Sequence, residues 1–393
     1  MQAAQVVSRR AVLAGTASVL IGGMTACQGD RRDGTANTSP TVTDESTTVL
    51  QPTTASTTAS TTTSTTTSTT AATTAPSGTS TYFPPADGEW ETLSPSAAGF
   101  TDGGIADVLE LVGETYGQSF IMLFEGRIVA EQYWQGATAT TVRDVASAQK
   151  SITSTLLGLA RDRGLLAFDD TVTSYLGVGW SAAAPSDEAL ITLLHLMTMS
   201  SGLSPTNLRK VAAPGTVWDY NTDAYQKLRR VLEVAAATDI NSISNDWLFA
   251  TIGLSTGSSW VDRAGVVDAV GDHQWGLRLT AREMARYGLF AARNGFWDGA
   301  QVTEPAWFAQ AWTATSLKRD YGYLWWLLGR GRLGNKGAPA DLVAALGAQD
   351  QKIYVSVSTG LVVARQGDAA KEDSANESDF DGLLLKAISR ARA

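Results

Sequence analysis

The stretch from residue 53 to residue 74 consists of threonine, serine and alanine alone, and it limits which part of the chain can fold. Such a segment cannot bury enough apolar surface to offset the conformational entropy lost on folding, so we expect it to be disordered. The composition becomes that of an ordinary globular protein at about Tyr82. We therefore predict a Thr/Ser-rich linker over residues 28–82 and one folded domain over residues 83–393.

The first 27 residues have the pattern of an export signal. Arg9-Arg10 precedes an apolar run at residues 12–23 that is too short to span a bilayer comfortably. The adjacent arginines favour the twin-arginine route. Met24-Thr-Ala-Cys27 resembles a bacterial lipobox, in which small residues precede a lipidated cysteine. We predict a signal peptide over residues 1–27 and an extracytoplasmic domain that is anchored through Cys27 or secreted. The alternative is that Cys27 is a chance thiol in a discarded signal.

The net charge and the small number of metal-ligating residues restrict which partners and metals this chain can bind. The formal net charge is −9 and no long Lys/Arg cluster occurs, which argues against nucleic acid as the main partner. One cysteine and two histidines are too few for a zinc site built from these residues, and no HExxH motif is present. We expect neither a metal nor a cofactor; the alternative is a metal site made only of carboxylates.

Apolar periodicity divides the folded part into strands and helices. Strands are expected at 118–124, 127–134, 351–357 and 360–365, and helices at 100–112, 147–163, 187–199, 222–237, 279–292 and 378–390. Residues 257–271 and the segment around His273 are expected to form loops. Because strands lie at both ends of the domain with a helical block between them, the predicted fold class is α/β (α+β), with an antiparallel sheet flanked by helices.

The sequence Ser147-Ala-Gln-Lys150 lies where one of these helices begins. Residues three apart on a helix are neighbours, so the lysine amine can reach the serine hydroxyl. The unpaired N–H groups of a first helical turn also favour negative charge near the serine. We interpret Ser147 as a nucleophile and Lys150 as its base. The motif alone is weak, because about one accidental match is expected in a chain of this length; the alternative is a capping serine and a solvated lysine.

Tyr220 is the third candidate. It follows Pro214-Gly-Thr-Val-Trp-Asp219 and precedes a predicted helix, in a turn where a phenol close to a cation could relay a proton. The alternative is a half-buried tyrosine that donates one hydrogen bond. His195 lies between leucines in a predicted helix, so a core histidine is favoured over a Ser-His pair.

Taken together, these stretches resemble the serine β-lactamase and penicillin-binding protein superfamily. The resemblance is closest to its class C-like branch, which includes carboxylesterases, D-aminopeptidases and 6-aminohexanoate-dimer hydrolases. The likeness is carried, in chain order, by Asp144–Ser151, Leu193–Leu203, Pro214-Gly-Thr216, Gly276–Arg282, Tyr321–Trp326 and Ala345–Gln351. It implies an antiparallel sheet with helices on both faces, a mostly helical subdomain, and an active site between them.

The resemblance also implies roles for particular residues. Ser147 matches the acylated serine, Lys150 the motif lysine and Tyr220 the catalytic tyrosine. The third family motif lies on a strand beside the serine. That strand is expected to begin near Gly347-Ala348, where the Ala348 amide would join that of Ser147 in an oxyanion hole. Gln351 lies where many hydrolase-type relatives also carry glutamine, and the resemblance places it with Gly347 and Ala348 in the oxyanion and substrate-binding set.

Three departures from the family pattern bear on the substrate. Thr222 stands where the β-lactamases have asparagine, no Lys-Thr-Gly occurs, and Gly347-Ala348-Gln349 lacks the usual basic or imidazole group. Those groups help to bind the carboxylate of β-lactams and peptide termini. We therefore expect a serine hydrolase acting on a small ester or amide, with cell-wall-derived molecules among the candidates. The alternatives are β-lactamase or D,D-peptidase-type activity and a non-catalytic cell-wall-sensing module on the same fold.

Overall fold

The computed structural model describes residues 81–255, 257–331, 333–370 and 380–393. The predicted signal peptide, Cys27 and nearly all of the predicted linker lie outside the described residues. Within those four ranges, no helix is long and apolar enough to cross a membrane.

An antiparallel sheet of five strands in the order β2-β1-β10-β9-β8 is the largest sheet among the described residues. Its strands are β1 (Gly117–Phe124), β2 (Arg127–Tyr133), β8 (Val343–Gly347), β9 (Gln351–Ser356) and β10 (Leu361–Gly367). The sheet therefore joins both ends of the domain, which confirms the fold class predicted from the sequence.

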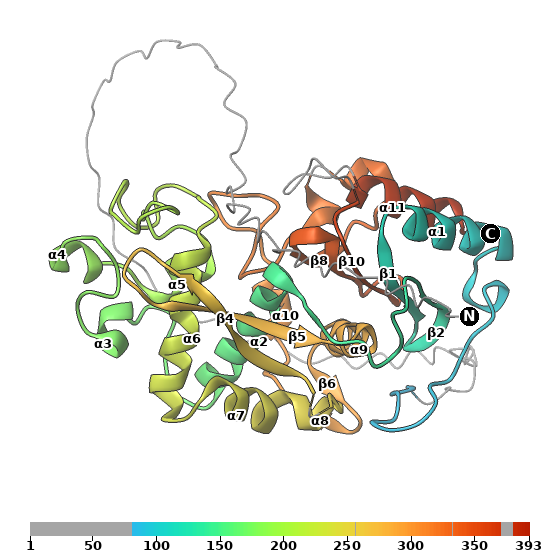
Figure 1. Cartoon of the computed structure of the whole chain (residues 1–393), viewed down its shortest axis with the longest axis horizontal. Helices are drawn as coiled ribbons and strands as arrows, with labels where there is room; N and C mark the ends of the chain where they lie inside the picture. The colour runs from blue at the N-terminus through green and yellow to red at the C-terminus, as the bar shows by residue number, and fades with distance from the viewer. Residues whose placement is uncertain (1–80, 256, 332, 371–379) are drawn as a thin grey trace, which may run out of the picture. The chain divides into compact units, whose positions relative to one another are not determined.

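Helices cover both faces of this sheet. Their bounds are α1 (Asp102–Glu114), α11 (Phe380–Arg390), α2 (Gln149–Asp162) and α9 (Ala281–Ala292). Side chains alternate along β1: Phe120 and Met122 pack into the core that contains α1 and α11, whereas Ile121 and Leu123 pack into the core that contains α2 and α9. Figure 1 shows α1 and α11 side by side over β1 and β10.

The remaining elements form a mostly helical part beside a small sheet, as Figure 1 shows. Its helices are α3 (Val172–Leu176), α4 (Pro185–Glu188), α5 (Leu193–Met197), α6 (Thr222–Ala236), α7 (Ile240–Ser244) and α8 (Ala250–Ile252). The small sheet has the order β3-β5-β4, with β3 (Arg143–Asp144), β4 (Ser259–Val267) and β5 (His273–Leu279). Later in the chain come the hairpin β6 (Phe296–Trp297) and β7 (Ala300–Gln301), and α10 (Trp307–Ala311).

Three predictions about individual segments were wrong. The helix expected over 187–199 is interrupted, because Thr171 and Thr192 form a β-bridge and the Thr192 side chain then caps α5 by accepting from the His195 N–H. The segment expected as a loop over 257–271 contains β4, and His273 begins β5. The strand was missed because its second half is exposed and its pairing shifts in register after Asp262, so it has no regular alternation.

Candidate active site

Ser147 lies in a 3₁₀ turn, Ala146–Ala148, that leads directly into α2. The residue before it, Ala146, has φ 50°, a left-handed conformation that non-glycine residues adopt rarely. The Asp144 carboxylate holds this turn by accepting the Ala146 N–H at 2.8 Å. Ser147 is partly exposed, whereas α2 is buried along nearly its whole length. The chain thus presents a hydroxyl at the start of a rigid buried helix.

Lys150 lies one turn further along the same face, as predicted. Its Nζ is 3.1 Å from Ser147 Oγ and 3.3 Å from Thr222 Oγ1. The same nitrogen lies 5.0 Å from the centre of the Tyr220 ring and 4.4 Å from that of Tyr225. The side chain is 2% exposed, so the alternative of a solvated lysine is wrong.

The surroundings of Lys150 favour its neutral form. Burial, followed by the positive charge of Arg263, lowers the pKa of Lys150 to about 7, against the opposing charge of Asp223. An amine with this pKa is about half deprotonated at neutral pH and can accept a proton from a hydroxyl within hydrogen-bond distance. The structure therefore pairs a hydroxyl with a base suited to activate it.

Tyr220 stands at the approach to α6 and forms one wall beside Lys150. Its ring stacks on Trp326 with centroids 6.1 Å apart and meets Tyr321 edge-on at 6.4 Å. Asn221 then caps α6, accepting the Ala224 N–H at 2.9 Å. These contacts hold the ring of Tyr220 beside the Lys150 amine.

The strand expected to begin near Gly347-Ala348 instead ends there, because β8 covers Val343–Gly347 and β9 begins only at Gln351. A Cβ on Gly347 would lie 2.3 Å from the Val145 carbonyl oxygen, so only glycine fits there without a shift. The chain then turns through Ala348–Asp350 into β9. The Gln351 amide group donates to the Gly367 carbonyl at 2.7 Å and to the Gln349 carbonyl at 3.2 Å. Gln351 thus braces the turn that carries the Ala348 amide.

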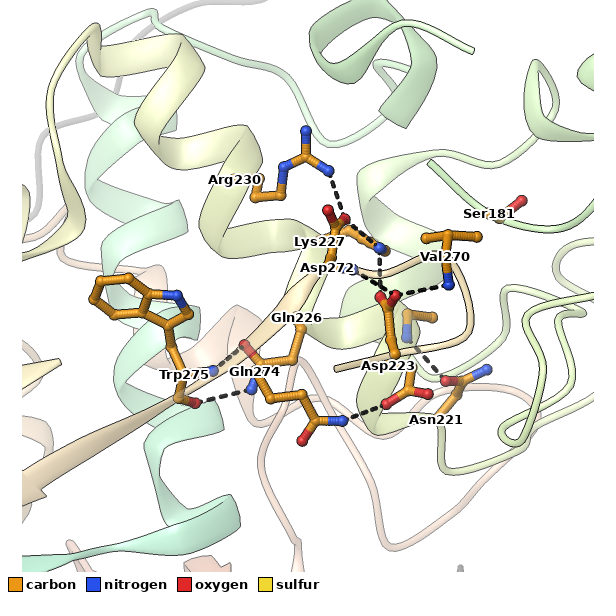
Figure 2. A network of polar contacts seen from close by, with 12 residues as sticks. Ser181, Asn221, Asp223, Gln226, Lys227, Arg230, Val270, Asp272, Gln274 and Trp275 are labelled. Atoms are coloured by element: carbon orange, nitrogen blue, oxygen red, sulfur yellow. Dashed lines mark hydrogen bonds and ion pairs between the residues drawn. The ribbon is translucent and has the colours of Figure 1, made fainter. Parts of the chain in front are cut away.

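A polar network fixes the start of α6 to β5 (Figure 2). Gln274 Nε2 donates to Asp223 Oδ1 at 2.6 Å, and Gln226 Nε2 donates to the Trp275 carbonyl at 2.9 Å. Burial raises the pKa of Asp223, with a further contribution from Asp268. The network holds the helix that carries Thr222 at a fixed distance from Lys150.

Further along α6, Lys227 is 1% exposed and bonds both Asp268 and Asp272 at 2.5 Å. Arg230 also reaches Asp272, as Figure 2 shows. This ion cluster ties the loop between β4 and β5 to α6.

Neither histidine contacts the Ser147 site in the described part of the chain. His195 Nδ1 lies 3.1 Å from Thr192 N, and its ring borders a cavity of about 390 Å³ together with Ser200, Gly215 and Tyr323. His273 is 55% exposed in its side chain and pairs with Asp262. Ser147, Lys150 and Tyr220 do not line that cavity, so it is separate from the predicted chemistry.

Three residues beside the site were not predicted from the sequence as functional: Asp144, Gln149 and Arg263. Gln149 is buried and bonds the β5 backbone, donating to the Trp275 carbonyl and accepting the Leu277 N–H. Asp144 and Gln149 flank Ser147 in sequence, which was an available signal. Arg263 lies more than a hundred residues away on a strand that was expected to be a loop, so no local pattern indicated it.

A two-faced antiparallel sheet, a helical part, and a Ser-x-x-Lys turn where α2 meets both are the features of the serine β-lactamase fold. The family model described as Beta-lactamase matches residues 107–381, more than half of the chain, and the protein therefore belongs to the β-lactamase family.

Solved structures share this fold at low sequence identity. A putative 6-aminohexanoate-dimer hydrolase from Bacillus anthracis is 16% identical, with a TM-score of 0.62 over 79% of this chain and 88% of that one. EstCE1, a hydrolase with promiscuous acyltransferase activity, is 15% identical, with a TM-score of 0.59 over 73% and 99%. A class C β-lactamase is 14% identical, with a TM-score of 0.57 over 74% and 96%.

One curated sequence relative is an uncharacterized protein of Alkalihalophilus pseudofirmus. It is 24% identical over an alignment of 213 residues, and the match covers 47% of this chain and 61% of that protein. The match thus spans less than two thirds of the relative's length.

Proposed function

We propose that this protein is an extracytoplasmic serine hydrolase that cleaves an ester or amide through an acyl-enzyme on Ser147, with Lys150 and Tyr220 as the proton-transfer pair. The observation that carries the proposal is the 3.1 Å separation of Lys150 Nζ and Ser147 Oγ, together with the burial that lowers the pKa of Lys150 to about 7. If Ser147 only capped the helix and Lys150 were only structural, neither role would require a lysine that is neutral at pH 7.

Acylation follows from these positions. Ser147 Oγ attacks the substrate carbonyl carbon while its proton passes to the Lys150 amine. The tetrahedral oxyanion is stabilised by the amide groups of Ser147 and Ala348. The bond to the leaving alcohol or amine then breaks, and Lys150, coupled to Tyr220, returns the proton to that group.

Deacylation runs through the same residues. A water molecule loses its proton to the Lys150–Tyr220 pair and attacks the acyl carbon. The ester bond to Ser147 breaks, its oxygen regains a proton, and a carboxylic acid leaves. Lys150 is the proposed base, because its amine lies within hydrogen-bond distance of Ser147 Oγ, and Tyr220 beside it is the proposed relay.

The substrate class rests on what surrounds the oxyanion hole. Gly347, Ala348 and Gln349 supply no cation for a substrate carboxylate, which favours a neutral ester or amide. The structural likeness to a putative 6-aminohexanoate-dimer hydrolase and to a hydrolase with promiscuous acyltransferase activity supports acyl-group hydrolysis. The second candidate is a β-lactamase or D,D-peptidase-type activity, which the family model and the class C neighbour favour.

A substrate panel tests the function. Wild type and Ser147→Ala are compared on p-nitrophenyl esters, the matching anilides and a chromogenic cephalosporin, and both are treated with a fluorophosphonate probe. We expect wild type to turn over esters or anilides and to be labelled, and Ser147→Ala to do neither while keeping its circular dichroism spectrum. Equal labelling of both proteins would refute a Ser147 acyl-enzyme. Slow acylation without turnover would instead support a cell-wall-sensing module.

The proposed location is tested separately. Lipid attachment at Cys27 would place the full chain in the membrane fraction of its host with a mass that includes a diacylglyceryl group. The expected result is a modified Cys27 in wild type and release of the protein in Cys27→Ser. An unmodified, freely soluble wild-type protein would contradict the anchor.

A further inference from the structure

The Asp144 carboxylate is anchored on both oxygens beside the nucleophile. Oδ1 accepts the Ala146 N–H at 2.8 Å, and Arg263 binds Oδ1 and Oδ2 through Nη2 and Nε, each at 2.8 Å. Planar bidentate pairs of this kind fix geometry as well as charge. The carboxylate thus connects Arg263 to the residue that directly precedes Ser147.

Arg263 also approaches the other side of the Ser-x-x-Lys turn. Its Nη2 lies 3.5 Å from Gln149 Oε1, and Gln149 directly precedes Lys150. Gln149 Oε1 accepts the Leu277 N–H at 2.8 Å. One guanidinium group, 17% exposed, therefore contacts side chains from both flanks of the turn.

Gly276 on β5 makes room for this pair. A Cβ at Gly276 would lie 2.4 Å from Asp144 Oδ2 and 2.7 Å from Arg263 Nε. These are the two atoms of one of the paired hydrogen bonds, so any larger residue must force them apart. The strand itself is held in place by the bonds of Gln226 and Gln274 to their neighbours (Figure 2).

We propose that Arg263 is a positioning residue of the Ser147 site: through Asp144 and in the space left by Gly276, it holds the Ala146–Ser147 turn, and it also contacts Gln149, which directly precedes Lys150. This inference rests on the proposed hydrolase function. Arg263 contacts no reacting atom, so it acts through the residues that it holds.

The charged and titratable groups around Lys150 come from β4, from α6 and from the turn that precedes α6. Arg263 on β4 disfavours a second cation, whereas Asp223 on α6 favours one. Tyr220 and Tyr225 face the amine with their rings, and burial raises the pKa of Tyr225 to about 12, which keeps it neutral. Arg263 is therefore the positive group whose removal should make Lys150 harder to deprotonate.

The experiment measures kcat and kcat/KM of the full domain between pH 5 and 9 for four variants. Arg263→Gln removes the charge and the paired bonds. Arg263→Lys keeps the charge and loses the bidentate geometry, and Gly276→Ala keeps both charged groups and displaces them. Arg282→Gln is the matched control, since Arg282 makes a similar bidentate pair with Glu131 at 2.6 and 2.8 Å, with comparable exposure.

We expect Arg263→Gln to lower kcat by about 10²-fold at pH 7, the order of loss that follows from a small misplacement of a reacting group. We also expect it to move the acid limb, the decline of kcat/KM on the acid side of the pH profile, to higher pH. Arg263→Lys should restore the acid limb but not the full rate. Gly276→Ala should lower kcat with the limb unmoved, and Arg282→Gln should leave the limb unmoved.

The proposal is overturned if Arg263→Gln keeps the wild-type acid limb, or if Arg282→Gln shifts it equally. Should Arg263→Gln fail to fold, a wild-type kcat in both Arg263→Lys and Gly276→Ala overturns the positioning role. Failure of the hydrolase function is distinguishable, because wild type itself would then not react with the fluorophosphonate probe at Ser147.

Discussion

Lys150 Nζ lies 3.3 Å from Thr222 Oγ1, so a threonine hydroxyl meets the amine at the position where the β-lactamases have asparagine. Threonine is shorter than the asparagine of the β-lactamases, but its hydroxyl still places an oxygen atom beside the Lys150 amine. We expect Thr222→Val to lower kcat roughly five- to tenfold, because one neutral hydrogen bond contributes about 1 kcal/mol. Steady-state ester hydrolysis measures this loss, and Thr222→Ser should retain most of the activity. Equal rates for the valine and serine variants would contradict a role for the hydroxyl.

The pKa of Lys150 sets the pH dependence of the reaction. With a pKa of about 7 in the folded protein, the amine is protonated as the pH falls below 7 and can no longer accept the Ser147 proton. We expect kcat/KM to decline on the acid side with an apparent pKa near 7, measured in buffers of constant ionic strength. Lys150→Arg keeps a cation at every pH, so it should be inactive throughout. Activity of this variant at pH 7 would exclude Lys150 as the base.

The same shift has a consequence for stability. Because the folded-state pKa of Lys150 is lower than the unfolded value of 10.5, the unfolded chain binds more protons between pH 7 and 10.5. Wild type is therefore destabilised below pH 7, and this cost disappears as the pH rises toward 10.5. Lys150→Met should raise the free energy of unfolding at pH 7 by about 2–4 kcal/mol and gain little near pH 10.5. Urea unfolding at both pH values measures the difference; a gain that does not change with pH would point to packing alone.

Local patterns were enough to predict four of the five strands of the main sheet and the helix start at Ser147, whereas β8 was not predicted. The alternation along β1 and the spacing of Ser147 and Lys150 are set by neighbours in sequence, and the structure keeps both. The small sheet was not predicted because β4 is half exposed and pairs irregularly with β5, so the residues of β4 show no regular alternation of apolar and polar side chains. Arg263 was missed for the same reason, since its role depends on Asp144, which lies 119 positions away. A contact between residues so far apart in the chain produces no periodic pattern in a single sequence.

Gly347 should be indispensable for a different reason from the charged residues. A methyl group there would lie 2.3 Å from the Val145 carbonyl oxygen, so Gly347→Ala must move either the end of β8 or the Ser147 turn. We expect fluorophosphonate labelling of Ser147 to slow by about 10²-fold. Gly103→Ala is the control, since a Cβ at that helical glycine meets nothing within 4 Å. Wild-type labelling rates for Gly347→Ala would show that β8 does not constrain the nucleophile.

Lys227 should contribute to folding rather than to the reaction. Its replacement by methionine removes the cation shared by Asp268 and Asp272, of which Asp268 is 1% exposed in its side chain. A buried carboxylate that loses its partner typically costs about 3–5 kcal/mol, so Lys227→Met should lower the free energy of unfolding by that order. The matched control is Lys210→Met, which breaks a pair with Asp187 in which the lysine is 42% exposed and which should cost at most about 1 kcal/mol. Denaturant unfolding of both variants measures the contrast, and equal losses would mean that the buried cluster contributes no more than a surface pair.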